Sequence, residues 1–268
     1  MYLIIIKVLV SILAVLALFF VSERSPKLGG LLAGIPLGTG IMVFFFGIEQ
    51  GAPFVMQGIP YSITALVSML FFTIGFYIGG KYFLNHPILH VISALFIGLL
   101  CFFFTSATIS LFKINLITSL IIFTLGAIMT VLFFNSLSMK KKSIPKKPTI
   151  SIVLFRALFI TVIVLLITGI ASQIGSHWAG MMASFPTALC PVLIILAYSY
   201  KNTLYPTVLK SFSYSITTLA IFYLLVYATY PLIGVYYGTL LTYIVCLVYM
   251  YGLNKLIHAN PKSRSPSE

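Results

Sequence analysis

Apolar runs of about 20 residues follow one another along almost the whole chain, and this feature limits the fold more than any other. A helix needs about 20 apolar residues to cross the hydrocarbon core of a bilayer. Of the 268 residues, 60% are hydrophobic and only 7% are charged, whereas soluble domains carry about 25% charged residues. The sequence therefore predicts an all-α polytopic membrane protein, with no room for a separate soluble domain.

The positions of these runs predict about nine transmembrane helices. Lys7 interrupts the first run, which also lacks a clear small-x-small cleavage site, so we expect a retained helix rather than a signal peptide. The polar end of the chain, residues 255–268, is expected to be a disordered cytoplasmic tail. The nine expected spans are residues 2–21, 28–48, 61–79, 87–106, 114–136, 151–171, 178–199, 209–229 and 231–251.

The net charge of +13 is explained by the topology of a membrane protein. Lys and Arg gather in short loops on the cytoplasmic side, and the loop "KKKSIPKKP" at residues 140–148 is the richest in lysine. Counting outward from it puts only Lys113 among the basic loop residues on the other side. We therefore expect a multi-pass protein of the inner (cell) membrane, with its N-terminus outside and its C-terminus in the cytoplasm. The bilayer is the expected partner, and nucleic acid is not.

An internal repeat divides the predicted spans into two sets of four. "GGLLAGIPLG" resembles "AGMMASFPTA" 150 residues later, and "YSITAL" returns as "YSITTL". The matched positions include Gly30, Ala33, Pro36 and Tyr61, which correspond to Gly180, Ala183, Pro186 and Tyr214. This pattern predicts a first repeat at 1–112, a linker helix with a basic loop at 113–150, and a second repeat at 151–254.

The two repeats are expected to have opposite orientations in the membrane, because five spans, an odd number, separate their starts. In this general plan the chain resembles inverted-repeat secondary transporters. The resemblance is architectural, and it implies a substrate site near the membrane midplane, where the two copies meet.

Pro36 and Pro186 occupy equivalent places near the middle of their predicted spans. Proline removes a backbone N–H group and frees a carbonyl, and non-helical backbone survives at this depth only against protein or water. Two broken helices would thus present polar backbone at the centre. The candidate substrate-binding residues are Gly34, Pro36, Gly38, Thr39, Ser184, Pro186, Thr187 and Ser215. The simpler alternative is a kink with close packing of small residues, in which the hydroxyl groups bond the freed carbonyls.

Three ionisable residues are candidates for binding an ion or a charged group, because charge within a membrane is costly. Lys7 and Arg156 lie near the starts of the first and sixth spans, where an anion could meet them. Snorkelling of both side chains to the headgroups is the favoured alternative. Glu49 ends the second span, where it could bind a coupling cation, pair with Lys7 or have no role.

Enzyme chemistry is not expected. The chain has only three acidic residues and four histidines, and it contains no HExxH, GxSxG or P-loop motif. The three cysteines lie in apolar runs without metal-ligand spacing, as packing residues do. We predict no catalytic residue, cofactor or metal.

Two functional hypotheses follow. The first is a secondary transporter for a small neutral, amphipathic or anionic molecule, which predicts a mid-membrane cavity lined by residues 33–40 and 183–191. The second is a non-transporting membrane scaffold or accessory subunit of an envelope complex, which predicts tight packing there. Substrate, coupling ion and oligomeric state stay open, including a homo-oligomer or an envelope partner.

Overall fold

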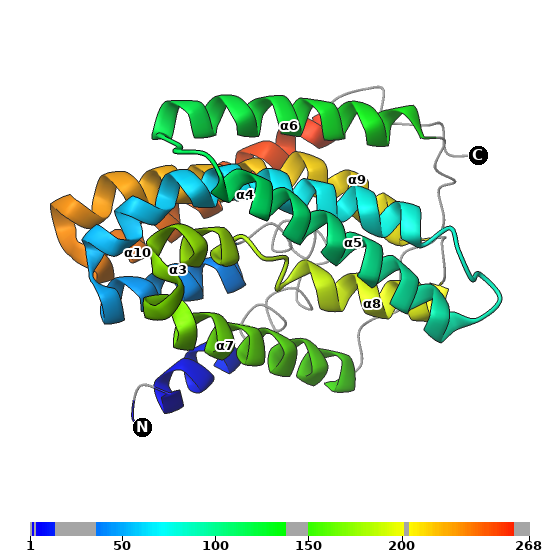
Figure 1. Ribbon diagram of the computed structural model, residues 1–268, viewed down its shortest axis with the longest axis horizontal. Coiled ribbons are helices and arrows are strands. Elements are labelled where there is room, and N and C mark those ends of the chain that lie inside the picture. The colour runs from blue at the N-terminus through cyan, green and yellow to red at the C-terminus, as the bar shows by residue number, and fades with distance from the viewer. Residues whose placement is uncertain (1, 3, 14–35, 138–149, 201–203, 260–268) are drawn as a thin grey trace.

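A computed structural model of the protein describes residues 2, 4–13, 36–137, 150–200 and 204–259. All regular secondary structure in these ranges is α-helical (Figure 1). A short helix, Ile4–Leu13, comes first. The longer elements are α3 (Leu37–Gln50), α4 (Ala52–Gly79), α5 (Pro87–Ser110), α6 (Leu116–Ser136), α7 (Ile150–Ala183), α8 (Leu189–Tyr200), α9 (Tyr205–Ser215) and α10 (Thr217–Ala259).

Five stretches of the described chain are long and apolar enough to cross a membrane. They are Ala52–Gly79, Pro87–Ser110, Leu116–Ser136, Ile150–Ala183 and Tyr205–Leu253. The predicted all-α membrane class is therefore confirmed. The count of nine spans and the inverted repeat remain predictions, and the end of the first span (14–21) and the start of the second (28–35) lie outside the described residues.

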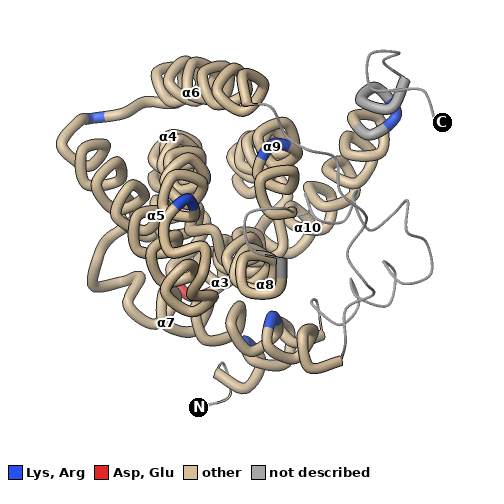
Figure 2. Tube along the Cα trace, turned by 90° about the vertical axis from the view of Figure 1, so that its right-hand side faces the viewer, with Lys and Arg blue, Asp and Glu red and all other residues tan. Residues whose placement is uncertain are grey.

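Helix α4 lies at the centre of the bundle. It contacts α3, α5, α6, α7, α9 and α10, with α6 and α7 on opposite sides of it (Figures 1 and 2). Most of its residues are buried, including Phe72 and Phe76. By contrast, α5 and α6 expose rows of large aliphatic and aromatic side chains, which is how helices face lipid tails. The core thus forms around α4, and the outer helices supply the apolar surface.

Helix α4 begins nine residues earlier than the predicted span, so residues 52–60 are helical and do not form the expected loop. Pro60 therefore lies inside the helix. Proline there leaves a backbone acceptor unpaired, and neighbouring side chains in membrane helices satisfy such groups. The acceptor that Pro60 leaves without its amide donor is the carbonyl of Met56, one turn earlier. The Thr64 hydroxyl bonds a different carbonyl, that of Pro60 itself, at 2.8 Å. The predicted start of this span at residue 61 is therefore too late, because the helix continues through Pro60.

Three single-residue turns share one backbone conformation. Gly51, Gly175 and Gly234 have φ of 85°, 76° and 77° and ψ of 162°, 167° and 174°. Only glycine adopts this region without strain. At each turn the chain reverses, and the junction of α3 with α4 and the bends of α7 and α10 lie at the left end of Figure 1. The chain thereby passes back and forth along the bundle with very short connections at that end.

A non-helical segment, Ser184–Ala188, interrupts the predicted span 178–199 between α7 and α8. Its Pro186 carbonyl accepts a hydrogen bond from the Cys190 amide at 2.8 Å. Helix α3 starts in the same way, since the Pro36 carbonyl accepts from the Gly40 amide at 2.7 Å. The two prolines thus begin helices by the same backbone bond, 150 residues apart.

Candidate functional site

The start of α3 and the non-helical segment Ser184–Ala188 touch each other through Gly38 and Thr187. A Cβ atom added to Gly38 would collide with the Thr187 hydroxyl, so the absence of a side chain permits the approach. Thr187 is buried. The two segments that carry the repeated proline therefore lie in direct contact, although they are far apart in the sequence.

Ser184 is the most highly connected polar residue at this contact. Its Oγ atom donates to the carbonyl oxygen of Ser62 at 2.8 Å and lies 2.7 Å from the Tyr223 hydroxyl. Because the serine proton is used on the carbonyl, the tyrosine hydroxyl donates to the serine oxygen. Ser184 thus links the interrupted segment to α4 and to α10.

The Thr39 and Ser62 side chains also lie close to the Tyr223 hydroxyl. We call Thr39, Ser62, Ser184 and Tyr223 the hydroxyl cluster. Each member is at most 4% exposed, and they come from α3, α4, the segment between α7 and α8, and α10. The cluster is uncharged, and each of its hydroxyl groups can both donate and accept a hydrogen bond.

A small hollow reaches the cluster from the side of the Gly51 and Gly175 turns. It has a volume of about 10 Å³ and is lined by Val43, Phe46, Phe54, Val55, Gly58, Ile59, Ser62, Ser176 and Gly180. The backbones pack closely here, since a Cβ on Gly180 would lie 2.5 Å from the Gly58 carbonyl and 2.9 Å from the Ser62 hydroxyl. This volume corresponds to about one water molecule.

A larger groove of about 290 Å³ lies beside the start of α3. Its lining is mostly apolar and consists of Val10, Leu37, Gly40, Ile41, Phe44, Thr239 and Tyr243. The Tyr243 hydroxyl donates to the Pro36 carbonyl at 3.1 Å. Neither hollow is lined by both of the stretches 36–40 and 183–191 that the structure describes, so these two hollows do not supply the cavity that the transporter hypothesis predicts.

The predicted substrate residues do not all lie together. Thr39 and Ser184 belong to the hydroxyl cluster, and Gly38 and Thr187 form the contact beside it. The carbonyls of Pro36 and Pro186 accept the first backbone bonds of α3 and α8. Ser215 ends α9, where its hydroxyl bonds the Phe212 carbonyl of its own helix at 3.3 Å, and no contact joins it to the cluster within the described residues. Gly34 lies outside those residues.

Sequence reasoning missed two tyrosines, Tyr223 and Tyr243. Both lie in apolar runs, and a buried tyrosine normally places its hydroxyl group on a partner. That rule would have marked both of them as residues that bond polar groups inside the bundle. The rule does not name the partners, which here are Ser184 and the Pro36 carbonyl.

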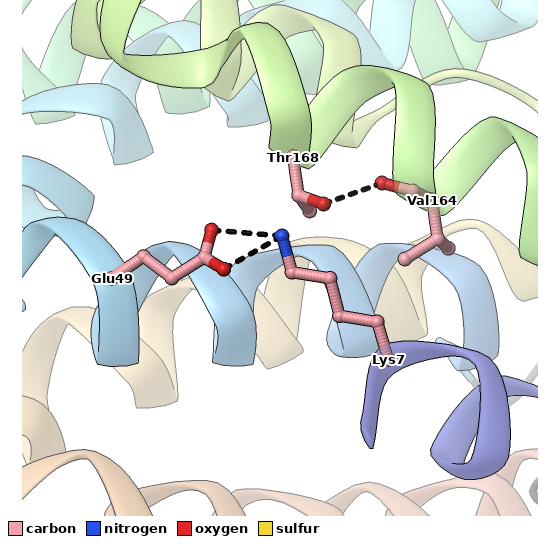
Figure 3. Close-up of polar contacts among 4 residues, drawn as sticks. All are labelled: Lys7, Glu49, Val164 and Thr168. Carbon is pink, nitrogen blue, oxygen red and sulfur yellow. Dashed lines mark hydrogen bonds and ion pairs between the residues drawn. The ribbon is translucent and has the colours of Figure 1, made fainter. Parts of the chain in front are cut away.

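Lys7 and Glu49 form a salt bridge (Figure 3). The Lys7 Nζ atom lies 2.7 Å and 2.9 Å from the two carboxylate oxygens, and the side chains are 6% and 16% exposed. The ammonium group also lies 5.6 Å from the centre of the Phe45 ring. Thr168 faces this pair, with its hydroxyl bonded to the Val164 carbonyl at 2.7 Å. Lys7 is therefore paired inside the protein and does not snorkel, because Glu49 offsets the cost of burying its charge.

Arg156 lies half-buried on α7. Its Nε atom has no hydrogen-bond partner within the part of the chain that the structure describes. The three cysteines are free thiols, and no group of three or more His, Cys, Asp or Glu side chains in the described ranges could hold a metal ion.

Comparison of the chain with protein-family models, with curated proteins and with solved structures finds no match. Any conclusion about function therefore rests on the geometry of the chain itself.

Proposed function

We propose that the chain is a secondary transporter of a small neutral, amphipathic or anionic molecule, with a site at the contact between its two proline-bearing segments. One observation carries this proposal: the non-helical Ser184 is hydrogen-bonded both to α4 and to α10. Interrupted helices at membrane depth are typical of substrate sites in such transporters.

The hydrogen bonds within the hydroxyl cluster can be replaced by hydrogen bonds to a ligand. A hydrogen bond between neutral groups contributes about 0.5–1.5 kcal/mol net, so a substrate with hydroxyl, amide or carboxylate groups can replace it at low cost. The starts of α3 and α8 add backbone N–H groups that bear partial positive charge and favour an anionic group. The small hollow and the groove flank this region, as expected of an occluded conformation.

We further propose the finer architecture: nine spans in two inverted four-helix repeats, in an inner membrane, with the N-terminus outside. The equivalent bonds from Gly40 to Pro36 and from Cys190 to Pro186 support the repeat. The junction of α3 with α4 and the bends of α7 and α10 lie at one end of the bundle (Figure 1), which agrees with the side assigned to those connections from the charge of the loops.

A ligand screen followed by a transport assay tests the proposal. A ligand that binds only the folded protein raises its melting temperature, and the compounds found this way are then tested for uptake into proteoliposomes. The double variant Pro36→Ala, Pro186→Ala should lose most uptake. Pro60→Ala is the matched control, since this proline lies inside a continuous helix. Wild-type uptake by the double variant would contradict the proposed site.

A non-transporting scaffold or accessory subunit of an envelope complex is the second candidate. The observation that favours it is the direct packing of Gly38 on Thr187, without a hollow lined by both segments among those described above. A scaffold would show no uptake of any stabilising ligand and would co-purify as a homo-oligomer or with an envelope partner. A transporter would show saturable uptake as a purified single protein.

A further inference from the structure

Two buried polar residues meet at the end of the bundle opposite the glycine turns, where α4 ends and α5 and α9 begin. His90 lies in the first turn of α5, and Tyr205 is the first residue of α9. Both are 0% exposed, and their ring centres lie 6.1 Å apart. Neither belongs to the hydroxyl cluster, and neither has a role in the proposed transport site.

The hydrogen bond of His90 fixes where its ring proton lies. Its Nδ1 atom is 3.1 Å from the carbonyl oxygen of Tyr82. A carbonyl can only accept, so in the neutral ring Nδ1 carries the hydrogen and Nε2 is left as an acceptor. This Nε2 atom is buried and has no hydrogen-bond partner within the described chain.

The Tyr205 hydroxyl supplies the complementary group. It is buried and also lacks a partner among the described residues. The hydroxyl presses against Gly80, where an added Cβ would collide with it, and the ring packs edge-on against Phe76 at 5.3 Å. One buried donor and one buried acceptor are thus left unpaired in neighbouring rings, although buried polar groups are nearly always paired.

We propose that one internal water molecule binds between Tyr205 and His90, accepting a hydrogen bond from the tyrosine hydroxyl and donating one to the Nε2 atom of the histidine. Buried waters occupy such sites because they satisfy groups that cannot reach each other. The water ties α9 to the junction of α4 and α5. The Lys81 ammonium group lies 4.8 Å from the Tyr77 ring at this end, and basic residues mark the cytoplasmic side.

We assign this link a role in closing the cytoplasmic end of the transport path, a part of the inference that rests on the proposed transport function. Tyr205 packs with Phe76 between the centre of the bundle and the loop that contains Lys81. Breaking the link would free α9 to move away from α4 and α5. Opening toward the cytoplasm requires α9 to separate from α4, because the two helices are in direct contact in this conformation.

Nitrogen NMR of the His90 ring tests the link without any transport assay. The other histidines, His86, His177 and His258, are replaced by glutamine in the full chain, which is then reconstituted in nanodiscs. We expect a protonated Nδ1, an Nε2 signal typical of a hydrogen-bonded acceptor, and magnetisation transfer from water. Tyr205→Phe should shift the Nε2 signal and remove the transfer, whereas Tyr82→Phe, a change to an exposed side chain, should alter neither. An Nε2 signal that is insensitive to Tyr205→Phe would overturn the link.

Thiol labelling tests the closing role separately. In a cysteine-free background, Leu209→Cys places a reporter on a fully buried position one turn along α9 from Tyr205. Adding Tyr205→Phe should raise the labelling rate at least several-fold from the cytoplasmic side, and adding Tyr82→Phe should leave it unchanged. An unchanged rate with an intact NMR response would overturn the closing role alone. Absence of transport would contradict the proposed function but leave the water site standing.

Discussion

The Oγ atom of Ser184 lies 2.7 Å from the hydroxyl oxygen of Tyr223, and the serine donates its own proton to the Ser62 carbonyl. Ser184 lies in the break between α7 and α8, and these two hydrogen bonds hold it to α4 on one side and to α10 on the other. The hydrogen bonds are strong enough to define one conformation and weak enough to be exchanged for others.

Ser184→Ala should destabilise the protein because it removes the serine oxygen that accepts the hydrogen bond of the fully buried Tyr223 hydroxyl. Leaving a buried polar group unsatisfied costs about 1–3 kcal/mol. Thermal unfolding in detergent should show a melting temperature lower by several degrees. Ser110→Ala is the control, since that half-buried serine bonds only its own helix at 2.7 Å and should change little. Equal melting temperatures for the two variants would show that the Ser184 bonds do not hold the break.

The Lys7–Glu49 salt bridge predicts a non-additive pair of substitutions. Removing either partner strands a buried charge, which costs about 3–5 kcal/mol in comparable cases, whereas replacing both with neutral residues can be nearly neutral. Lys7→Met and Glu49→Gln should each lower the melting temperature strongly, and the double variant should recover much of the loss.

Lys113→Met, at an exposed lysine outside any ion pair in the described chain, controls for the change of charge. If the losses from Lys7→Met and Glu49→Gln simply add, the two residues do not interact, and the pairing in Figure 3 is wrong.

Alanine substitutions at three glycines with equally open surroundings are predicted to differ in their effect on stability. A Cβ at Gly175, Gly234 or Gly169 would have no neighbour within 4 Å, so packing cannot distinguish the three. Gly175 and Gly234 have positive φ, and alanine there should cost about 1–3 kcal/mol through backbone strain. Gly169 is helical, and alanine there should be neutral or stabilising by up to about 1 kcal/mol. Unfolding of the three single variants measures the difference, and similar effects at all three sites would contradict the turn geometry.

The contact between Gly58 and Gly180 predicts that alanine at either position will push α4 and the end of α7 apart. A Cβ on Gly58 would lie 2.7 Å from the Ser176 carbonyl, and the atoms facing Gly180 are mostly backbone as well. Overpacking of this kind costs about 1–3 kcal/mol. Gly180→Ala should also weaken ligand stabilisation, because it displaces Ser62 in the hydroxyl cluster. Normal ligand stabilisation in that variant would place the site elsewhere.

The sequence predicted the membrane class and the break at Pro186 because both depend on local chemistry. Long apolar runs require membrane helices, and proline in mid-span cannot continue the backbone ladder. The start of α4 was misplaced because Pro60 lies inside a continuous helix, whereas proline usually marks a helix boundary. Pairing of Lys7 with Glu49 was one of the alternatives, but snorkelling was favoured because the two residues lie 42 positions apart in the chain, and only the packing of α3 brings them together.

Only half of the hydroxyl cluster could be predicted, because tertiary packing brings the other half to it. Thr39 and Ser184 stood out as hydroxyl residues beside repeated prolines, a pattern that is visible within a few residues of the sequence. Tyr223 belongs to the cluster through the packing of α10 against α4, and its position in an apolar run resembles that of many tyrosines in the chain. Ser215 lies at the end of α9, because the predicted span is divided at Ile216.

Labelling of a single cysteine at position 184 from each side of the membrane tests the central claim most directly. In a variant with Cys101, Cys190 and Cys246 replaced by serine, Ser184→Cys is exposed to a small impermeant thiol reagent in right-side-out and in inside-out vesicles. A site that alternates between the two sides predicts labelling in both preparations, with a ligand from the stability screen slowing it in each. A cysteine that is labelled from neither side, or from one side only, would contradict alternating access at this break.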